Sequence, residues 1–233
     1  MEFQFKQFTV QQSDSAAKIT TDATVFAASL PLQKDVKHVL EIGTGTGVMS
    51  LMLRQRQQLQ LDAVELEQGA YEEAKLNFEN SPFKDDLAIF HTAVQDFSPS
   101  KRYDLIFSNP PFFTDNLRSE INPKKNLAYH TESLSFDELA ESINRFLADG
   151  GKAFVMLPHY ESLQFDKCMV GKGFFINENY QIKHNINKAP LRRIVGYSFQ
   201  KNDHPEFSIL IRELDGQFSM QYKALMQPYL TIF

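Results

Sequence analysis

Two short motifs contain residue types that could hold a small ligand and transfer a group from it. The first, E-I-G-T-G-T-G over residues 41–47, contains the last two residues of a short apolar run and the glycine-rich turn that follows it. Glycines at a strand-to-helix turn let the backbone approach a ligand closely, and the start of the helix offers free N–H groups. Glu65 ends a second apolar run, where a carboxylate can accept both hydroxyls of a ribose. Together they predict a nucleotide site.

The details of the first motif favour S-adenosylmethionine over a dinucleotide. A dinucleotide-binding turn has the spacing G-x-G-x-x-G, whereas this chain has G-x-G-x-G. Glu41 precedes the first glycine and would repel a pyrophosphate. A carboxylate there favours the positive sulfonium and α-amino groups of S-adenosylmethionine. A turn needed only for strand-to-helix geometry would explain the glycines, but not Glu41 and Glu65 together with them.

The second motif, Asn109-Pro110-Pro111-Phe112, ends another apolar run. An amino nitrogen conjugated to a ring or carbonyl is a poor nucleophile. Its two N–H groups can bind the Asn109 side-chain oxygen and the Pro110 carbonyl, which concentrates electron density on the nitrogen as it attacks a methyl carbon. The prolines fix the carbonyl orientation, and Phe112 can stack on a flat acceptor. A proline-terminated strand with a core phenylalanine is the alternative.

Alternating patterns predict the elements that position these motifs. Strands are expected at residues 38–42, 61–65, 87–91, 103–108 and 152–157, with helices at 48–57, 69–80 and 136–147. This alternation indicates an α/β fold with a mostly parallel sheet and helices on both faces. Three later strand-like runs, at 180–186, 193–199 and 207–212, indicate an antiparallel edge, and we expect the last two to pair as a hairpin. Ligands bind at the carboxyl edge of such sheets.

Length and composition restrict the possibilities further. The chain has 233 residues, which suits a single domain, and its net charge of −5 argues against a surface that is basic all round. The first ten residues alternate as a strand does and no apolar run could span a membrane, so a cytoplasmic location is expected. The scattered histidines lack metal-ligand spacing, and no metal site is expected. Arg192, Arg193 and Lys188 form a basic cluster that could face RNA.

The two motifs together resemble the amino-nitrogen methyltransferases with an Asn/Asp-Pro-Pro-Phe/Tyr signature. The whole chain resembles the bacterial tRNA1(Val) (adenine-37) amino methyltransferase family, through F-K-Q-F at 5–8, K-I-T-T-D-A at 18–23, D-A-V-E-L-E at 62–67 and the closing segment at 222–233. The resemblance implies a Rossmann-like class I methyltransferase fold with seven strands. It implies methyl transfer from S-adenosylmethionine to the exocyclic nitrogen of adenine-37 in tRNA1(Val), with no membrane and no obligate protein partner.

The resemblance also assigns residues. Residues 1–36 would form an extension that covers the cofactor, and 113–133 a substrate loop. The residues expected to hold the cofactor are Lys18, Thr21, Asp22, Glu41, Gly43, Gly45, Glu65, Leu66, Asp96 and Asn109. Of these, Asp22 and Thr21 would line the methionine end, Glu65 would hold the ribose and Leu66 would flank the adenine. Asp96 would replace an acidic contact to the adenine amino group, because Ala93 stands at the usual position. The target base would be held by Asn109, Pro110 and Phe112.

Other acceptors and roles remain open from sequence. A glutamine side-chain amide in a protein such as a release factor suits the same Asn-Pro-Pro-aromatic pocket, although the chain begins as a strand and not as a helical substrate domain. DNA methylation would call for a separate target-recognition domain, which we do not find. A cofactor-binding RNA chaperone without catalysis would be expected to lose the Asn109-Pro110-Pro111 motif, which is present.

Overall fold

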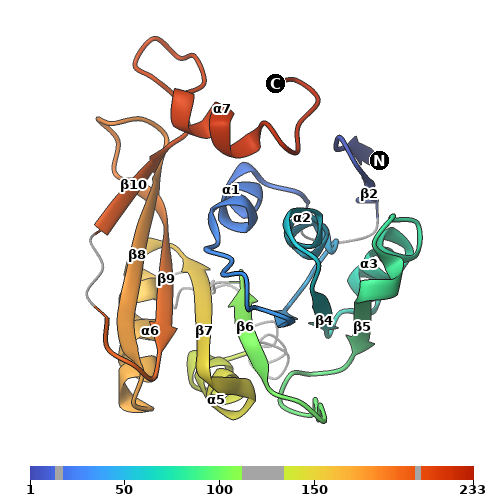
Figure 1. The fold of residues 1–233 in the computed structure, drawn as a ribbon. Helices are drawn as coiled ribbons and strands as arrows, with labels where there is room; N and C mark the ends of the chain where they lie inside the picture. The colour runs from blue at the N-terminus through green and yellow to red at the C-terminus, as the bar shows by residue number, and fades with distance from the viewer. Residues whose placement is uncertain (14–17, 112–133, 203–205) are drawn as a thin grey trace, which may run out of the picture.

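The computed structural model describes residues 1–13, 18–111, 134–202 and 206–233. Its centre is an eight-stranded sheet in the order β10-β8-β9-β7-β6-β3-β4-β5 (Figure 1). In chain order the strands are β3 (His38–Ile42), β4 (Gln60–Glu65), β5 (Leu87–His91), β6 (Tyr103–Ser108), β7 (Leu147–Leu157), β8 (Phe175–Lys183), β9 (Pro190–Ser198) and β10 (Glu206–Leu210). Neighbouring strands are parallel except that β9 runs against both β7 and β8.

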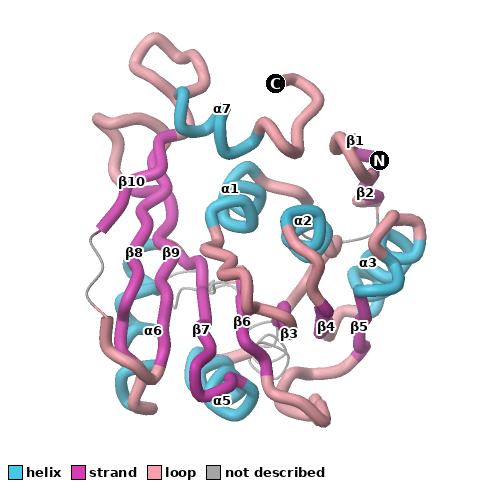
Figure 2. Tube along the Cα trace, viewed as in Figure 1, coloured by secondary structure: helices cyan, strands magenta, loops and turns pink. Residues whose placement is uncertain are grey.

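The helices are α1 (Thr21–Ser29), α2 (Val48–Arg56), α3 (Gln68–Glu79), α5 (Phe136–Phe146), α6 (His159–Gly171) and α7 (Met220–Met226), with a 3-10 turn η1 (Lys84–Asp86). Figure 2 shows them distributed around the central sheet. Two short strands, β1 (Glu2–Gln4) and β2 (Thr9–Gln11), form an antiparallel pair at the start of the chain. No helix within the described residues is long and apolar enough to cross a membrane.

Two hydrophobic cores lie on opposite faces of the sheet, because successive strand side chains point to opposite sides. In β3, Val39 belongs to the core shared with α1, α2 and α7, whereas Leu40 belongs to the core shared with α5 and α6. The same alternation separates Ile194 from Val195 in β9. The helices therefore cover both faces, as the sequence predicted.

The carboxyl edge of the sheet gathers the ends of β3, β4 and β6. Ile42 pairs with both Val64 and Ser108, so the residues that follow these three strands leave the sheet at one level. Since β9 is antiparallel, its beginning lies at the same edge, where Arg193 pairs with Leu157 of β7. The two sequence motifs are thus brought to neighbouring strand ends.

Three expectations about the strands were wrong in detail. The runs at 193–199 and 207–212 do not pair as a hairpin, because β9 already has β7 on one side and β8 on the other. β10 instead pairs in parallel with β8, with Phe207 opposite Tyr180, and forms an eighth strand beyond the seven expected. The antiparallel element of this edge is β9, and the first ten residues form two strands in place of one.

The two ends of the chain are held together. Phe5 forms an isolated β-bridge with Leu230, and the Lys6 amide donates to the Tyr229 carbonyl at 2.8 Å. The Lys6 ammonium donates to the carbonyl oxygens of Gln227 and Phe233 at 2.6 and 2.8 Å. Figure 1 shows the labelled termini near one another. The N-terminal segment is therefore fixed by the last residues of the chain.

Candidate active site

The glycine turn between β3 and α2 has a backbone that requires its glycines. Gly43, Gly45 and Gly47 have φ values of 74°, 56° and 78°, in the left-handed region that residues with a Cβ rarely adopt. A Cβ on Gly47 would also lie 2.5 Å from Cε1 of Phe78. A Cβ on Gly43 would meet no heavy atom within 4 Å, so the space beside Gly43 is open. Gly47 is required for packing, whereas Gly43 leaves room for a ligand.

Glu41 is the most unusual charged residue at this turn. It is fully buried, and its Oε2 accepts hydrogen bonds from the hydroxyls of Thr44, at 2.7 Å, and Ser50. Its other oxygen, Oε1, is buried and accepts no hydrogen bond from any described residue. Burial raises the pKa of Glu41 to about 8, the two hydroxyls oppose this shift, and the nearby charge of Glu65 adds to it. A buried carboxyl with one unused oxygen fits a cationic ligand group.

Glu65, at the end of β4, binds the turn from the other side. Its Oε2 accepts from the Gly45 amide at 2.9 Å, and its Oε1 accepts from the amides of Leu66 and Glu67 at 2.9 and 3.0 Å. A carboxylate has about four acceptor sites, so three amides leave capacity for a further donor. Glu65 therefore both shapes the glycine turn and keeps an acceptor for a ligand hydroxyl.

Leu66 and Asp96 lie beyond the end of β4. Leu66 is 53% exposed, and its carbonyl oxygen lies 3.0 Å from Nε2 of His91, whose ring stacks on Tyr71. The turn after β5 is joined to this region, since the Thr92 amide donates to the Glu65 carbonyl at 3.1 Å. Asp96 is exposed in that turn, and its amide donates to the carbonyl of Ala93. Leu66 and this turn thus lie on the same side of Glu65.

The first turn of α1 reaches the same edge through an ion pair. Thr20 caps the helix, and the Asp22 carboxylate lies 2.9 Å from Nε of Arg192 near the start of β9. Thr21 is exposed beside it. Lys18 donates to the backbone carbonyl of Gln12 at 2.6 Å, so its ammonium is bound within the N-terminal segment. The carboxylate of Asp22 is therefore already paired with an arginine.

Asn109 and Pro110 follow directly on β6. Asn109 is half-buried and Pro110 is buried, whereas Pro111 is exposed. Their position is fixed by Ser108, which is fully buried and whose hydroxyl donates to the Ile42 carbonyl at 2.7 Å. This bond joins the end of β6 to the end of β3, immediately before the glycine turn. Phe112 and the predicted substrate loop, 113–133, lie outside the described residues.

The adjacent arginines of β9 have different environments because neighbouring strand residues face opposite sides. Arg192 points toward α1 and Asp22, while Arg193 is buried against α6, where it donates to Oδ2 of Asp166, and it also donates to Oδ1 of Asn179 in β8. The hypothesis that this pair faces RNA is therefore wrong for Arg193, which contributes to the packing of α6.

Asn77 is a site residue that the sequence reasoning missed. This α3 residue is 2% exposed, and its Nδ2 donates to the carbonyls of Thr46, at 2.9 Å, and Gln11, at 3.0 Å, while its Oδ1 accepts from the Gln11 amide. It thereby ties β2 to the glycine turn. An asparagine on the same helix face as Ala70 and Ala74 was the available signal, since a polar residue on a buried face needs partners.

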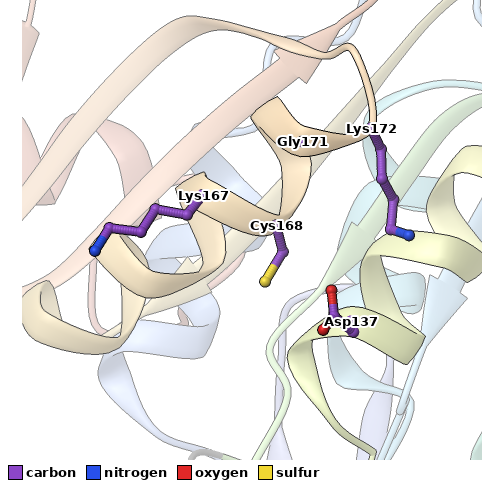
Figure 3. Close-up of a pocket in the computed structure, with 5 residues that line it drawn as sticks. All are labelled: Asp137, Lys167, Cys168, Gly171 and Lys172. Atoms are coloured by element: carbon purple, nitrogen blue, oxygen red, sulfur yellow. The ribbon is translucent and has the colours of Figure 1, made fainter.

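A separate hollow lies between α5 and α6, lined by Asp137, Lys167, Cys168, Gly171 and Lys172 (Figure 3). Cys168 is half-buried; burial raises the pKa of its thiol, and the nearby Asp137 raises it further. A thiol of raised pKa is a weaker nucleophile at neutral pH because less of it is ionised. The hollow adjoins the last turn of α6. Because α6 begins at the carboxyl edge, its last turn lies away from that edge, and the hollow does not belong to the glycine-turn site.

Comparison with known proteins agrees with this geometry. The Methyltransferase small domain family matches residues 9–156, which contain the glycine turn and the Asn-Pro-Pro motif. A tRNA1(Val) (adenine(37)-N6)-methyltransferase of Dyadobacter fermentans is 39% identical over 236 residues, 99% of this chain and 98% of the relative. The chain belongs to the tRNA1(Val) (adenine(37)-N6)-methyltransferase family. Another member, from Flavobacterium psychrophilum, is also 39% identical and covers 97% of this chain and 98% of its own.

Solved structures of other methyltransferases have a fold similar to that of this chain. A predicted O-methyltransferase from Agrobacterium tumefaciens aligns with a TM-score of 0.70 over 88% of this chain and 95% of that chain, at 14% identity. A methyltransferase from Pyrococcus furiosus aligns with a TM-score of 0.60 over 83% of this chain and 90% of its own, at 19% identity. At these identities the likeness confirms the predicted fold.

Proposed function

We propose that this chain transfers a methyl group from S-adenosylmethionine to the exocyclic amino nitrogen of adenine-37 in tRNA1(Val). The observation that supports this most directly is the hydrogen bond from Ser108 to Ile42, which sets Asn109-Pro110 beside the glycine turn. A ligand carrying a reactive methyl at the turn would then face an amide oxygen suited to an amino acceptor. The relatives named above, similar over nearly their whole length, carry the name of this activity.

The cofactor is held by residues of the glycine turn and its neighbours. S-adenosylmethionine supplies an electrophilic methyl on a positively charged sulfur. The unused Oε1 of Glu41 receives positive charge from the methionine end, and the open space at Gly43 lets the backbone approach. Glu65 accepts the ribose hydroxyls with the capacity left by its three amides. Leu66 covers the adenine, and Asp96 accepts its amino group.

The acceptor is held by the end of β6. The Asn109 side-chain oxygen and the Pro110 carbonyl accept the two N–H groups of the adenine, and Phe112 stacks on the base. These acceptors align the nitrogen lone pair with the methyl, and the proton leaves after transfer. Most of the rate enhancement then comes from positioning and electrostatic fit, so no strong base is required.

The N-terminal extension, residues 1–36, covers the cofactor in this proposal. Its support is that Asp22 and Thr21 begin a helix at the carboxyl edge, and that Asn77 binds β2 to the glycine turn. One domain thus provides both the glycine turn on which the cofactor lies and the N-terminal extension that covers it. Residues 113–133 are proposed as the substrate loop.

The test combines labelled S-adenosylmethionine with unmodified total tRNA and, separately, with release-factor protein, followed by nucleoside mass spectrometry. Label in methyladenosine of one valine tRNA is the expected result. Label in protein would move the acceptor to a glutamine amide, and label in neither, despite cofactor binding, would refute the proposed acceptor. Asn109→Ala serves as the inactive control.

A further inference from the structure

The turn between β8 and β9 and the first turn of α6 lie at the same edge of the sheet as Asn109. β8 runs parallel to β6, so its end at Lys183 and the following residues, 184–189, leave the sheet at the carboxyl edge. α6 begins directly after β7 at this edge. Figure 1 shows the β8–β9 turn at the end of the sheet toward which β6 points. We call the exposed side chains here, Tyr160, Ile186, Lys188 and Leu191, the rim surface.

The distance from the rim surface to the proposed acceptor site suits a short stretch of nucleic acid. Ser108 is level with Val155, and Val155 with Val195, two strands away. β9 begins at Pro190, five residues earlier. From strand spacing and rise, the turn lies about 15 Å from Asn109, which a few nucleotides can span.

The rim surface differs in charge from the chain as a whole. The segment H-N-I-N-K-A-P-L-R-R, residues 184–193, contains three Lys or Arg residues and no Asp or Glu, in a protein of net charge −5. Arg192 and Arg193 are paired with Asp22 and Asp166, and Lys188 is exposed. The neighbouring turn, which follows β10, contains the exposed acids Glu213 and Asp215, and these border the rim surface on one side. Lys188 is therefore the positive charge that the rim offers to a phosphate, and the acids of the neighbouring turn would repel a phosphate beyond it.

The rim also presents apolar and aromatic groups that a solvated loop would not need. Tyr160 is 64% exposed, Ile186 57% and Leu191 44%. Exposed aromatic side chains beside cations are typical of surfaces that bind single-stranded nucleic acid, because unpaired bases stack on the ring while cations contact phosphates. Paired RNA offers no free base faces, so the combination favours a loop.

We propose that the rim surface binds the unpaired RNA that flanks the target base. In this proposal Lys188 contacts a phosphate, and Tyr160 and Ile186 contact bases. This inference rests on the proposed function. It accounts for RNA binding by an acidic protein through one local cationic and aromatic surface beside the acceptor site. None of the four rim residues is among the proposed cofactor residues, so variants of the rim are expected to leave cofactor affinity unchanged.

The test measures binding of an unmodified valine tRNA transcript by fluorescence anisotropy at several salt concentrations, for wild type, Lys188→Gln and Tyr160→Ala. Matched controls are Lys34→Gln, an exposed lysine before β3 at the opposite edge, and Phe175→Ala, a 43% exposed aromatic at the start of β8. Calorimetry with S-adenosylmethionine on each variant reports both folding and the cofactor site.

Lys188→Gln is expected to lower the slope of log affinity against log salt by about 0.7, the value for one phosphate on a single strand. Tyr160→Ala is expected to weaken RNA binding about tenfold, within the range for one lost base stack. Both variants should keep wild-type cofactor affinity. Wild-type RNA affinity and salt slope in both would overturn the assignment, as would equal losses in the controls. A wild type that binds S-adenosylmethionine but no tRNA would refute the proposed function and this inference with it.

Discussion

In the proposed site, Glu41 is expected to make the affinity for S-adenosylmethionine depend on pH. Burial raises the pKa of Glu41 to about 8. With that value, about 1% of the carboxyl is ionised at pH 6 and about 9% at pH 7. If only the ionised form receives the cationic end of the cofactor, the apparent affinity is proportional to this fraction. The dissociation constant for S-adenosylmethionine should therefore fall about ninefold from pH 6 to pH 7.

Glu41→Gln separates this effect from other titrations. A glutamine Oε1 can accept the hydroxyls of Thr44 and Ser50, so the turn should keep its shape, but no proton can be released. Its cofactor affinity should be weaker than that of wild type at pH 7 and nearly constant between pH 6 and 7. The cofactor α-amino group, with a pKa of about 8, stays mostly protonated in this interval. Isothermal titration calorimetry in buffers of different ionisation enthalpy would also detect the proton that wild type releases.

Stability provides an independent measurement. Because the folded-state pKa of Glu41 is raised above its ordinary value of 4.5, the folded protein holds the extra proton between pH 4.5 and 8. Its contribution to stability is complete below pH 4.5 and is lost as pH rises toward 8. From pH 5 to 8 wild type should lose about 3 to 4 kcal/mol of unfolding free energy relative to Glu41→Gln. Equal pH dependence of cofactor affinity in the two proteins, or no difference in urea unfolding, would refute this reasoning.

Three further variants test the site. Asn109→Ala should lower kcat about a hundredfold or more, since one electrostatic partner of the reacting group is lost, while calorimetric cofactor affinity changes only a few-fold; equal losses in both would refute the acceptor role. Glu65→Gln should weaken cofactor binding about tenfold, because one charge-assisted bond to the ribose is lost, and an unchanged dissociation constant would mean that the ribose is held elsewhere. Asp22→Asn and Arg192→Gln should each weaken cofactor binding, and the double variant should weaken it less than the product of the two, because the residues form one ion pair. Multiplicative effects would show that Asp22 acts without Arg192, and Arg192→Lys should restore part of the affinity.

Much of the fold follows from local patterns. The runs at 87–91 and 103–108 match β5 and β6 in both bounds, because each is a short apolar segment between polar turns. The pairing of β10 could not be predicted from local sequence, because the partner of an edge strand depends on which other strand has an unpaired side. β9 has none, so β10 joins β8.

The sequence indicates the candidate site residues that lie at the ends of strands. It does not indicate contacts between side chains that come from segments far apart in the sequence. Glu41 and Glu65 lie at the ends of strands that the sequence identifies, and the glycines and Asn109 directly follow such strands. The ion pair between Asp22 and Arg192 joins α1 to a strand far along the chain, and no local pattern indicates it. A pair of adjacent arginines suggests one basic patch, but the alternation of a strand sends them to opposite faces.

The bonds between Lys6 and the final residues also have a consequence for biosynthesis. Lys6 can bind its partners at Gln227, Tyr229 and Phe233 only after 221 or more further residues have been synthesised. The strands of the central sheet precede these residues, so the sheet can form earlier, whereas the N-terminal segment that leads to Asp22 gains the contacts of Lys6 only afterwards. A protein shortened by its last seven residues would keep every residue of the glycine turn and the Asn-Pro-Pro motif, yet lose the contacts that Lys6 makes. Such a truncation would therefore act on the helix start at the cofactor edge from the far end of the chain.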